Sequence, residues 1–203
     1  MDEKPSQGEK IGPWTRLDSR EIYENAWIRV REDRILHPDG TPGIYGVVHF
    51  KNIAVAVVAL DAASRVLLVG QYRYSMGGYS WEIPEGGCPM GVDTPESAAA
   101  RELREETGFT ADRWDYLGCM ALSNSVSDEV GHFFLARDLA AGAAQPDASE
   151  DLAVKSVDME EAWRMAMEGE LNESLTIAGL ARARHFLALE EQGRAPNPYA
   201  RRP

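Results

Sequence analysis

The order of apolar and polar positions predicts a chain whose first half is mainly β-structure. Two alternating segments, WIRVRED at 27–33 and IYGVVHF at 44–50, flank the turn-rich HPDGTPG at 37–43 and predict an antiparallel β-module. Apolar, β-branched runs follow at 53–60 and 66–74. Runs of this kind are typical of buried central strands. A second set of strands is therefore expected after the module.

Helical periodicity begins after the Gly- and Pro-rich stretch 81–96. In PESAAARELREETG, Thr94 is placed to cap the helix N-terminus, Pro95 occupies its first turn and Gly108 ends it. Further elements are predicted downstream, with strands at 114–122, 131–137 and 151–158 and helices at 159–170 and 173–192. This order predicts an α/β protein in which a mixed β-sheet is sandwiched between helices.

Four segments are expected along the chain. Residues 1–12 and 191–203 are rich in proline and charge and poor in core formers, so they are interpreted as loose tails. Residues 13–52 form the antiparallel β-module. Residues 53–190 hold the main domain, and 203 residues suffice for one such domain with an appendage.

Composition and charge exclude several kinds of partner. A net charge of −12 argues against nucleic acid, which is bound mainly through Lys and Arg, and favours a divalent cation wherever the protein binds an anion. No apolar run is long enough for a membrane span, and the polar, acidic start does not resemble a secretory signal. A cytoplasmic location without membrane contact is therefore expected. Cys88 and Cys119 lack disulfide or zinc spacing.

Three carboxylates share one surface of the helix at 95–108. Glu102 and Glu106 are four residues apart and Glu102 and Glu105 three apart, so the side chains are neighbours. Like charges at this spacing destabilise a helix by about 0.2–0.5 kcal/mol per pair. A bound Mg²⁺ or Mn²⁺ would remove that cost, since both ions prefer hard oxygen ligands.

A solvated charged face is the alternative interpretation of this helix, and an Arg101–Glu105 ion pair at i, i+4 would support it. The preceding loop favours the metal site. Gly86 and Gly87 allow the backbone to approach a ligand closely and place carbonyl oxygens beside the carboxylates.

The residues from Gly87 to Phe109 resemble the Nudix box: Gly, five residues, Glu, seven residues, then Arg-Glu-apolar-any-Glu-Glu-any-Gly-apolar. The chain reads Gly87-CPMGV-Asp93-TPESAAA-Arg101-Glu102-Leu103-Arg104-Glu105-Glu106-Thr107-Gly108-Phe109. Every fixed position matches except Asp93, where the family usually has Glu. The resemblance implies a Nudix fold and Mg²⁺-dependent hydrolysis of a diphosphate, with Mn²⁺ as a substitute and two or three ions per site.

The same resemblance assigns roles within the box. Glu102, Glu105 and Glu106 would bind the metal, with Glu106 central and the Gly86 carbonyl as a further ligand. Arg101 would orient these carboxylates by pairing with Asp93, whose shorter side chain puts that support in question.

Over 14–189 the chain is most similar to the ADP-ribose and nucleoside-diphosphate-sugar pyrophosphatases. Their Gln-any-Arg strand end is matched by Gln71-Tyr72-Arg73, and their Glu-any-Pro-any-Gly loop by Glu82-Ile83-Pro84-Glu85-Gly86. The subfamily implies a homodimer in which both subunits line each site. Arg73 and Glu82 would contact the substrate, although an arginine at a strand end is equally typical of a surface ion pair.

The box itself does not determine substrate specificity, and the resemblance implies a general base from a later loop. Trp27 or Tyr45 of the β-module would stack on the base, or else they serve packing. The general base is expected in a later loop, from Glu129 or Glu150, while Glu105 is a further candidate. By its place in the family pattern Glu129 also fits a contact to the second sugar, and Glu150 lies in an acidic loop.

The predicted reaction is hydrolysis of ADP-ribose or a related nucleoside diphosphate sugar to a nucleoside monophosphate and a sugar phosphate. The alternatives are a hydrolase of GDP-mannose or UDP-sugars and, in another class, a non-catalytic nucleotide-binding Nudix module. Such modules typically erode the glutamates, which this chain retains. A dinucleotide or nucleoside-triphosphate enzyme fits the β-module less well.

Overall fold

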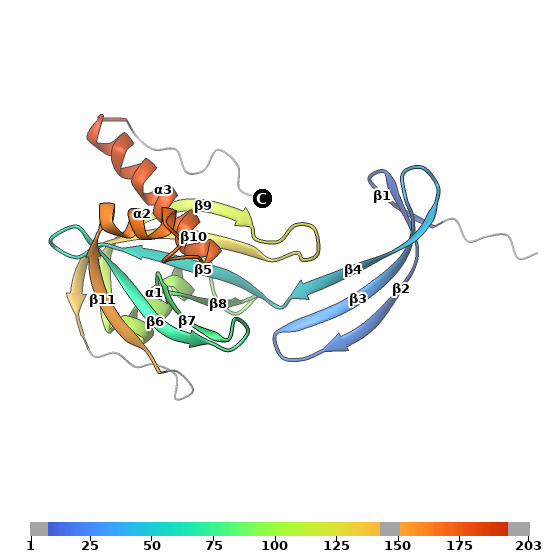
Figure 1. Cartoon of the computed structure of the whole chain (residues 1–203), viewed down its shortest axis with the longest axis horizontal. Coiled ribbons are helices and arrows are strands. Elements are labelled where there is room, and N and C mark those ends of the chain that lie inside the picture. Colours follow the sequence, from blue (N-terminus) through green and yellow to red (C-terminus); the bar gives the residue numbers. More distant parts are fainter. Residues whose placement is uncertain (1–7, 143–150, 195–203) are drawn as a thin grey trace, which may run out of the picture. The chain divides into compact units, whose positions relative to one another are not determined.

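The computed structural model describes residues 8–142 and 151–194, and these divide into two compact units. The first unit runs to Asn52 and also includes Ser123–Glu129. The second contains Ile53–Leu122 and the chain from Val130 onward. Figure 1 shows the strands of the first unit in blue and the sheets and helices of the second in the remaining colours.

The N-terminal unit is built on one antiparallel sheet in the order β1-β2-β3-β4. Its strands are β1 (Glu9–Ile11), β2 (Trp14–Glu24), β3 (Ile28–Leu36) and β4 (Pro42–Phe50). The predicted β-module and its turn at 37–43 are present, and Gly40 adopts a φ of 84° in that turn. The expectation of a loose tail over 1–12 is wrong for residues 9–11, which pair with residues 14–16 of β2. This strand forms by backbone pairing across a tight turn, and its sequence carries no alternating apolar pattern that would predict it.

Segment 123–129 also belongs to the N-terminal unit, although the predicted boundaries placed it in the main domain. It runs beside β4: the Val48 amide donates to the Val126 carbonyl at 2.8 Å, and the Asp128 amide donates to the Val48 carbonyl at 3.3 Å. The Phe50 amide donates to the Asp128 carboxylate at 3.0 Å. The unit is therefore assembled from two separate parts of the chain.

The described residues of the second unit form two sheets, of order β8-β5-β10-β9 and β11-β6-β7. Their strands are β5 (Asn52–Ala59), β6 (Arg65–Arg73), β7 (Gly78–Glu82), β8 (Glu85–Pro89), β9 (Phe109–Ala121), β10 (Val130–Ala141) and β11 (Ala153–Asp158). Strands β5 and β10 are parallel, whereas β9 pairs with β10, and β6 with both its neighbours, in antiparallel fashion. The Val57 amide donates to the Pro84 carbonyl at 2.8 Å, which ties β5 to the chain that follows β7.

In the part of the chain that the structure describes, three helices cover the two faces of these sheets (Figure 1): α1 (Pro95–Thr107), α2 (Met159–Met167) and α3 (Ser174–Glu191). Alternate residues of β5 point to opposite faces, as strand geometry requires. Val55 and Val57 pack with α1, and Ala56 and Val58 pack with α2 and α3. The predicted sandwich of helix, mixed sheet and helix is confirmed. No helix in the described ranges is long and apolar enough to span a membrane.

The ends of α1 form as the sequence predicts. The Thr94 side chain accepts a hydrogen bond from the Ser97 amide, Pro95 begins the helix, and Gly108 takes a left-handed φ of 76° at its end. Strand β8 was not predicted, because Gly86, Gly87 and Pro89 are poor strand formers. Its pairing with β5 comes from tertiary structure.

Candidate active site

The carboxylates of α1 lie against residues 83–87, here called the Gly86 loop, which joins β7 to β8 and includes the first residues of β8. Glu106 is buried with 5% of its surface exposed, and its carboxylate accepts a 3.1 Å hydrogen bond from the Glu85 amide. Leu103 on the same helix is fully buried against the sheet and fixes the rotation of α1. The helix therefore presents its glutamates to the loop at a defined angle.

Gly86 allows this approach because it has no side chain. A Cβ built at position 86 would lie 2.1 Å from the carboxyl carbon of Glu102, far inside van der Waals contact. Only a glycine fits here while Glu102 keeps its place. The structure thus brings Glu102, Glu106 and Gly86 together, as the sequence predicts.

Arg101 lies among the acidic groups of the box. Its guanidinium donates to Glu102 at 2.8 Å, to Glu105 at 3.1 Å and to the Gly87 carbonyl at 2.7 Å. Asp93 is 3.8 Å from Arg101, an ion-pair distance without a hydrogen bond. The predicted Arg101–Asp93 pairing is therefore loose. Asp93 instead accepts from the Thr94 amide at 3.1 Å and so supports the start of α1.

Arg73 forms ion pairs at the end of β6. Its Nε donates to both carboxylate oxygens of Glu82, at 2.9 and 3.1 Å, and its Nη2 donates to Glu85 at 2.6 Å. Glu82 is buried, with only 1% of its surface exposed. Of the two interpretations of Arg73, the ion pair is present, while a third of its side chain remains open to solvent. Glu82, predicted to contact substrate, here holds Arg73.

Glu85 was not predicted as a site residue, because it occupies an unspecified position of the Glu-any-Pro-any-Gly loop. Burial, and next the negative charge of Glu173, raise the pKa of the Glu85 carboxyl well above its ordinary value. Its Oε2 atom is buried without a hydrogen-bond partner. A second glutamate within one loop is the sequence signal that could have identified it.

The residues of this region fit a hard divalent cation. All the candidate ligands are oxygens, and Gly86 leaves room for Glu102 beside the backbone. Among the described residues, no three Asp, Glu, His or Cys side chains are gathered so that they could hold a metal ion by themselves. Waters and substrate oxygens commonly complete Mg²⁺ coordination, so the metal assignment stays a prediction that the donor set supports.

The remaining predicted residues lie in the N-terminal unit or outside the described residues. Trp27 has 67% of its surface exposed, just before β3, and Tyr45 donates from its hydroxyl to the Ser125 carbonyl at 2.7 Å. Glu129 ends segment 123–129. Glu150, a candidate general base, lies outside the described residues. Their roles are not tested by these contacts.

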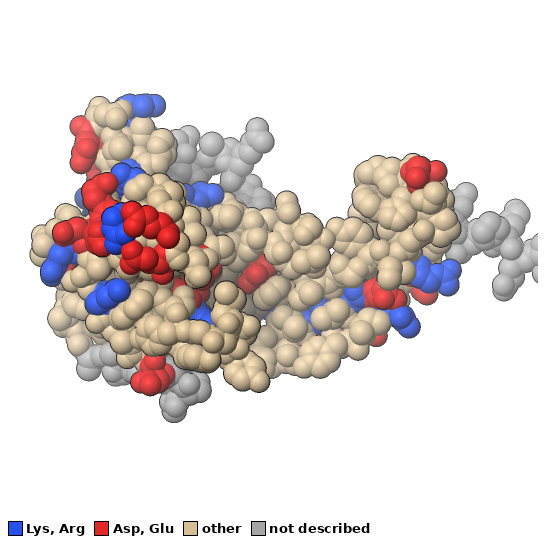
Figure 2. Space-filling model, viewed as in Figure 1, with Lys and Arg blue, Asp and Glu red and all other residues tan. Residues whose placement is uncertain are grey.

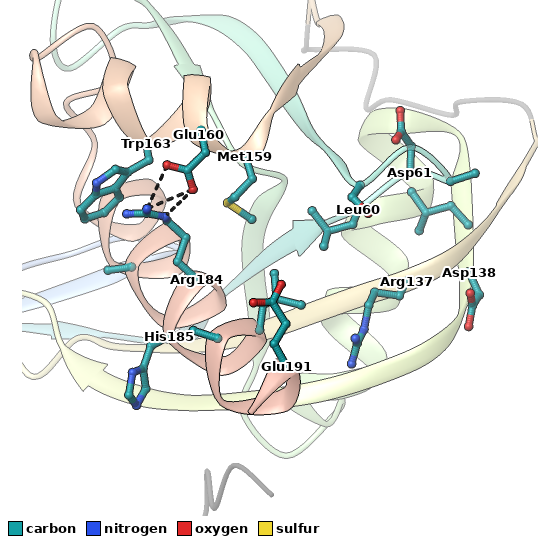
Figure 3. Close-up of a pocket in the computed structure, with 16 residues that line it drawn as sticks. Leu60, Asp61, Arg137, Asp138, Met159, Glu160, Trp163, Arg184, His185 and Glu191 are labelled. Atoms are coloured by element: carbon teal, nitrogen blue, oxygen red, sulfur yellow. Dashed lines mark hydrogen bonds and ion pairs between the residues drawn. The ribbon is translucent and has the colours of Figure 1, made fainter. Parts of the chain in front are cut away.

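A separate cavity of about 870 Å³ lies between α2, α3 and the ends of β5 and β10, and none of the predicted site residues lines it. Figure 3 shows Arg184 at its wall, held by Glu160 at 3.0 Å, and the guanidinium lies 4.7 Å from the Trp163 ring centre. Figure 2 shows further acidic side chains gathered over α2. There Arg164 pairs with glutamates of α2 and of the turn after it, namely Glu161, Glu168 and Glu170.

Two protein-family models together match most of the chain. The NUDIX domain matches residues 50–176, and the nucleoside diphosphate sugar hydrolase N-terminal domain matches residues 14–48. These ranges correspond closely to the second and first units of the structure.

Sequence comparison with individual proteins also finds ADP-ribose pyrophosphatases. The ADP-ribose pyrophosphatase of Mycobacterium tuberculosis is 33% identical over 81% of this chain and 80% of its own length. The ADP-ribose pyrophosphatase of Bacillus subtilis is 33% identical over 86% of this chain and 92% of its own. A methanol dehydrogenase activator of Bacillus methanolicus is 28% identical over 86% of this chain and 92% of its own length.

A solved structure described as an ADP compounds hydrolase superposes with a TM-score of 0.79, covering 92% of this chain and 100% of that chain. At 20% identity this likeness establishes the fold alone. The sequence matches carry the assignment further, since they cover both units and include the box. The chain belongs to the Nudix hydrolases with a nucleoside diphosphate sugar hydrolase N-terminal domain, and it is a pyrophosphohydrolase of the ADP-ribose and nucleotide-sugar type.

Proposed function

We propose that the protein hydrolyses ADP-ribose to AMP and ribose 5-phosphate. The observation that carries this proposal is the 33% identity, over four fifths or more of each chain, to two proteins named ADP-ribose pyrophosphatases. The contacts between α1 and the Gly86 loop support the chemistry, since they gather carboxylates beside backbone carbonyls. Water attacks one phosphorus atom, the bridging P–O bond breaks, and the proton from water is taken up by a base.

Glu102, Glu105, Glu106 and the Gly86 carbonyl would hold Mg²⁺, with Mn²⁺ as a substitute and two or three ions per site. When bound, these ions neutralise the diphosphate and lower the pKa of a coordinated water. The chain supplies the rigid frame. The Glu85 amide orients Glu106, and Arg101 restrains both Glu102 and Glu105 through hydrogen bonds of 2.8 and 3.1 Å.

Arg73 has a side chain suited to contact a phosphate, because a guanidinium can donate two parallel hydrogen bonds to it. Its guanidinium is held by Glu82 and Glu85, which fix its orientation while part of it stays exposed. We assign Glu82 to substrate binding through this arginine. We assign the uptake of the proton from water to Glu150 or Glu105. Glu129 would either contact the second sugar or take part in the same proton transfer.

The N-terminal unit would provide base recognition and dimerisation. It is a single sheet with several large apolar side chains exposed, namely Ile11, Ile22, Tyr23, Trp27 and Ile44. A sheet of this kind is stabilised when a second layer covers one face. We propose that a second copy of the chain does so, and that Trp27 stacks on the base in a site shared by two subunits.

A substrate panel tests the activity. Purified protein with Mg²⁺ is incubated with ADP-ribose, ADP-glucose, GDP-mannose and UDP-glucose, and nucleoside monophosphate is measured by chromatography. We expect AMP from ADP-ribose with the highest kcat/KM. Faster hydrolysis of GDP-mannose or UDP-glucose would replace ADP-ribose by the alternative substrate class. No hydrolysis of any compound would favour a non-catalytic nucleotide-binding module.

Matched substitutions on α1 test the metal ligand. Glu106→Gln should reduce kcat by more than the roughly 10–100-fold that residues supporting a metal ligand cost. Glu96→Gln is the control, since Glu96 is an exposed glutamate in the first turn of the same helix. Equal activity of wild type and Glu106→Gln would contradict the metal assignment.

Sizing in solution by light scattering tests the dimer. We expect twice the chain mass of 22.4 kDa. A monomer at the concentrations of the assay would contradict the shared site.

A further inference from the structure

The start of α3 contacts the loop that carries the candidate metal ligands. The Ile83 amide donates a 3.1 Å hydrogen bond to the Thr176 hydroxyl, although the two residues are 93 positions apart. Both residues are fully buried, with 0% of their surface exposed. A buried amide needs a partner, and Thr176 supplies the one that no neighbouring strand provides at this point.

Thr176 is itself held in place. The Glu173 carboxylate caps α3 by accepting from the Leu175 amide at 2.8 Å and from the Thr176 amide at 2.7 Å. One turn later, a Cβ on Gly179 would lie 2.6 Å from the Ile83 Cδ1 atom. Helix and loop therefore meet closely at two successive turns of the same helix face.

The loop passes directly from this contact to the metal-binding groups. After Ile83, the Pro84 carbonyl accepts from Val57, the Glu85 amide donates to Glu106, and Gly86 faces Glu102. The hydrogen bonds of the Pro84 carbonyl and the Glu85 amide restrain the chain between Ile83 and Gly86, so a shift of the Ile83 amide would strain both of them. Ile83, which donates to the Thr176 hydroxyl, is three residues before Gly86 in this restrained segment.

We propose that Thr176 is a positioning residue for metal binding, acting through the Ile83 amide on the Glu85–Gly86 segment. The inference rests on the proposed function, in which Gly86 and the α1 glutamates hold the ion. It predicts that removing the hydroxyl weakens metal affinity by about 10–100-fold, the range found when groups that orient metal ligands are lost.

The test is Mn²⁺ binding to the full-length protein, followed by electron paramagnetic resonance without substrate. Thr176→Val keeps the side-chain volume but removes the acceptor, and Thr176→Ser keeps the acceptor. We expect Thr176→Val to weaken Mn²⁺ binding at least about tenfold and Thr176→Ser to stay near wild type. Val157→Ala, in β11 away from the loop, serves as the control for general destabilisation.

The outcomes are distinct. Wild-type Mn²⁺ affinity in a folded Thr176→Val protein overturns the inference and leaves the proposed function intact. Equal weakening in Val157→Ala also overturns it, because lost stability would then explain both. If Thr176→Val does not fold, Gly179→Ala is measured instead, because its Cβ would press on the Ile83 side chain, 2.6 Å from its Cδ1 atom, while the Thr176 hydroxyl stays in place. Weaker Mn²⁺ binding then supports the inference, and wild-type affinity overturns it. Mn²⁺ binding that Glu106→Gln leaves unchanged contradicts the metal assignment of the proposed function instead.

Discussion

Gly86 and Glu102 approach so closely that any Cβ at position 86 would overlap the glutamate carboxyl group, 2.1 Å from its carbon. Gly86→Ala should therefore displace Glu102 and reduce kcat by about 100-fold, as misplacement by an ångström does in other sites. Gly78→Ala in β7 is the matched control, because nothing lies within 4 Å of its added Cβ. Equal kinetics for the two variants would mean that the loop adjusts freely.

The cap of α1 gives a prediction on stability. Thr94→Ala removes the acceptor of the Ser97 amide and should cost about 1 kcal/mol, or roughly 2–4 °C in Tm for a chain of this size. Thr94→Ser should retain most of that stability. Thermal unfolding followed by circular dichroism measures both, and an unchanged Tm in Thr94→Ala would show that the cap is dispensable.

Arg73 should contribute to stability as well as to activity. Arg73→Ala leaves the buried Glu82 carboxylate without its cation and should destabilise the protein by about 3 kcal/mol. Arg73→Ala combined with Glu82→Gln should recover part of that loss, because the buried charge is then gone. Denaturant unfolding measures the difference, and no recovery in the double variant would contradict the pairing.

A surface ion pair predicts a specific pH dependence. Hydrogen bonding from Arg137, and then from Arg113, lowers the pKa of Glu190 below its ordinary value of 4.5. A lowered folded pKa stabilises the protein above the unfolded pKa, and this stability is lost as pH falls through the folded value. Glu190→Gln should therefore reduce the free energy of unfolding at pH 7 by less than about 1 kcal/mol, and the resulting drop in Tm should shrink below pH 4.5. A constant difference across the acid range would contradict this.

Metal binding should raise thermal stability if the carboxylates of α1 hold the ion. At ten times its dissociation constant, Mg²⁺ adds about 1.4 kcal/mol, or roughly 3–6 °C in Tm. A chelator should reverse the shift and abolish hydrolysis, and added Mg²⁺ should restore both. Glu106→Gln is expected to lose the Mg²⁺-dependent shift. The same shift in that variant would place the ion elsewhere.

Local signals made much of α1 and its surroundings predictable. The helix carries its own start and stop in Thr94, Pro95 and Gly108, and all three act as the sequence indicates. The spacing of its glutamates follows from helix geometry alone. The alternation of apolar residues in β5 likewise assigns its two faces without knowledge of the neighbouring strands.

The features that were missed depend on contacts between distant residues. Strand β8 contains two glycines and a proline and forms because it pairs with β5. The burial of Glu85 follows from packing against Arg73 and the start of α3, which no local pattern shows. The loose Arg101–Asp93 distance reflects the missing methylene and the use of Asp93 at the helix start.

Segment 123–129 has a consequence for protein engineering. Because it adds main-chain hydrogen bonds to β4, the N-terminal unit is not a continuous module that can be cut at residue 52 and exchanged between relatives. A chimera joined there would inherit a β4 and a segment 123–129 from different parents. Successful recombination would have to move both pieces together, with the contacts of Val48 and Phe50 as the pairings to preserve.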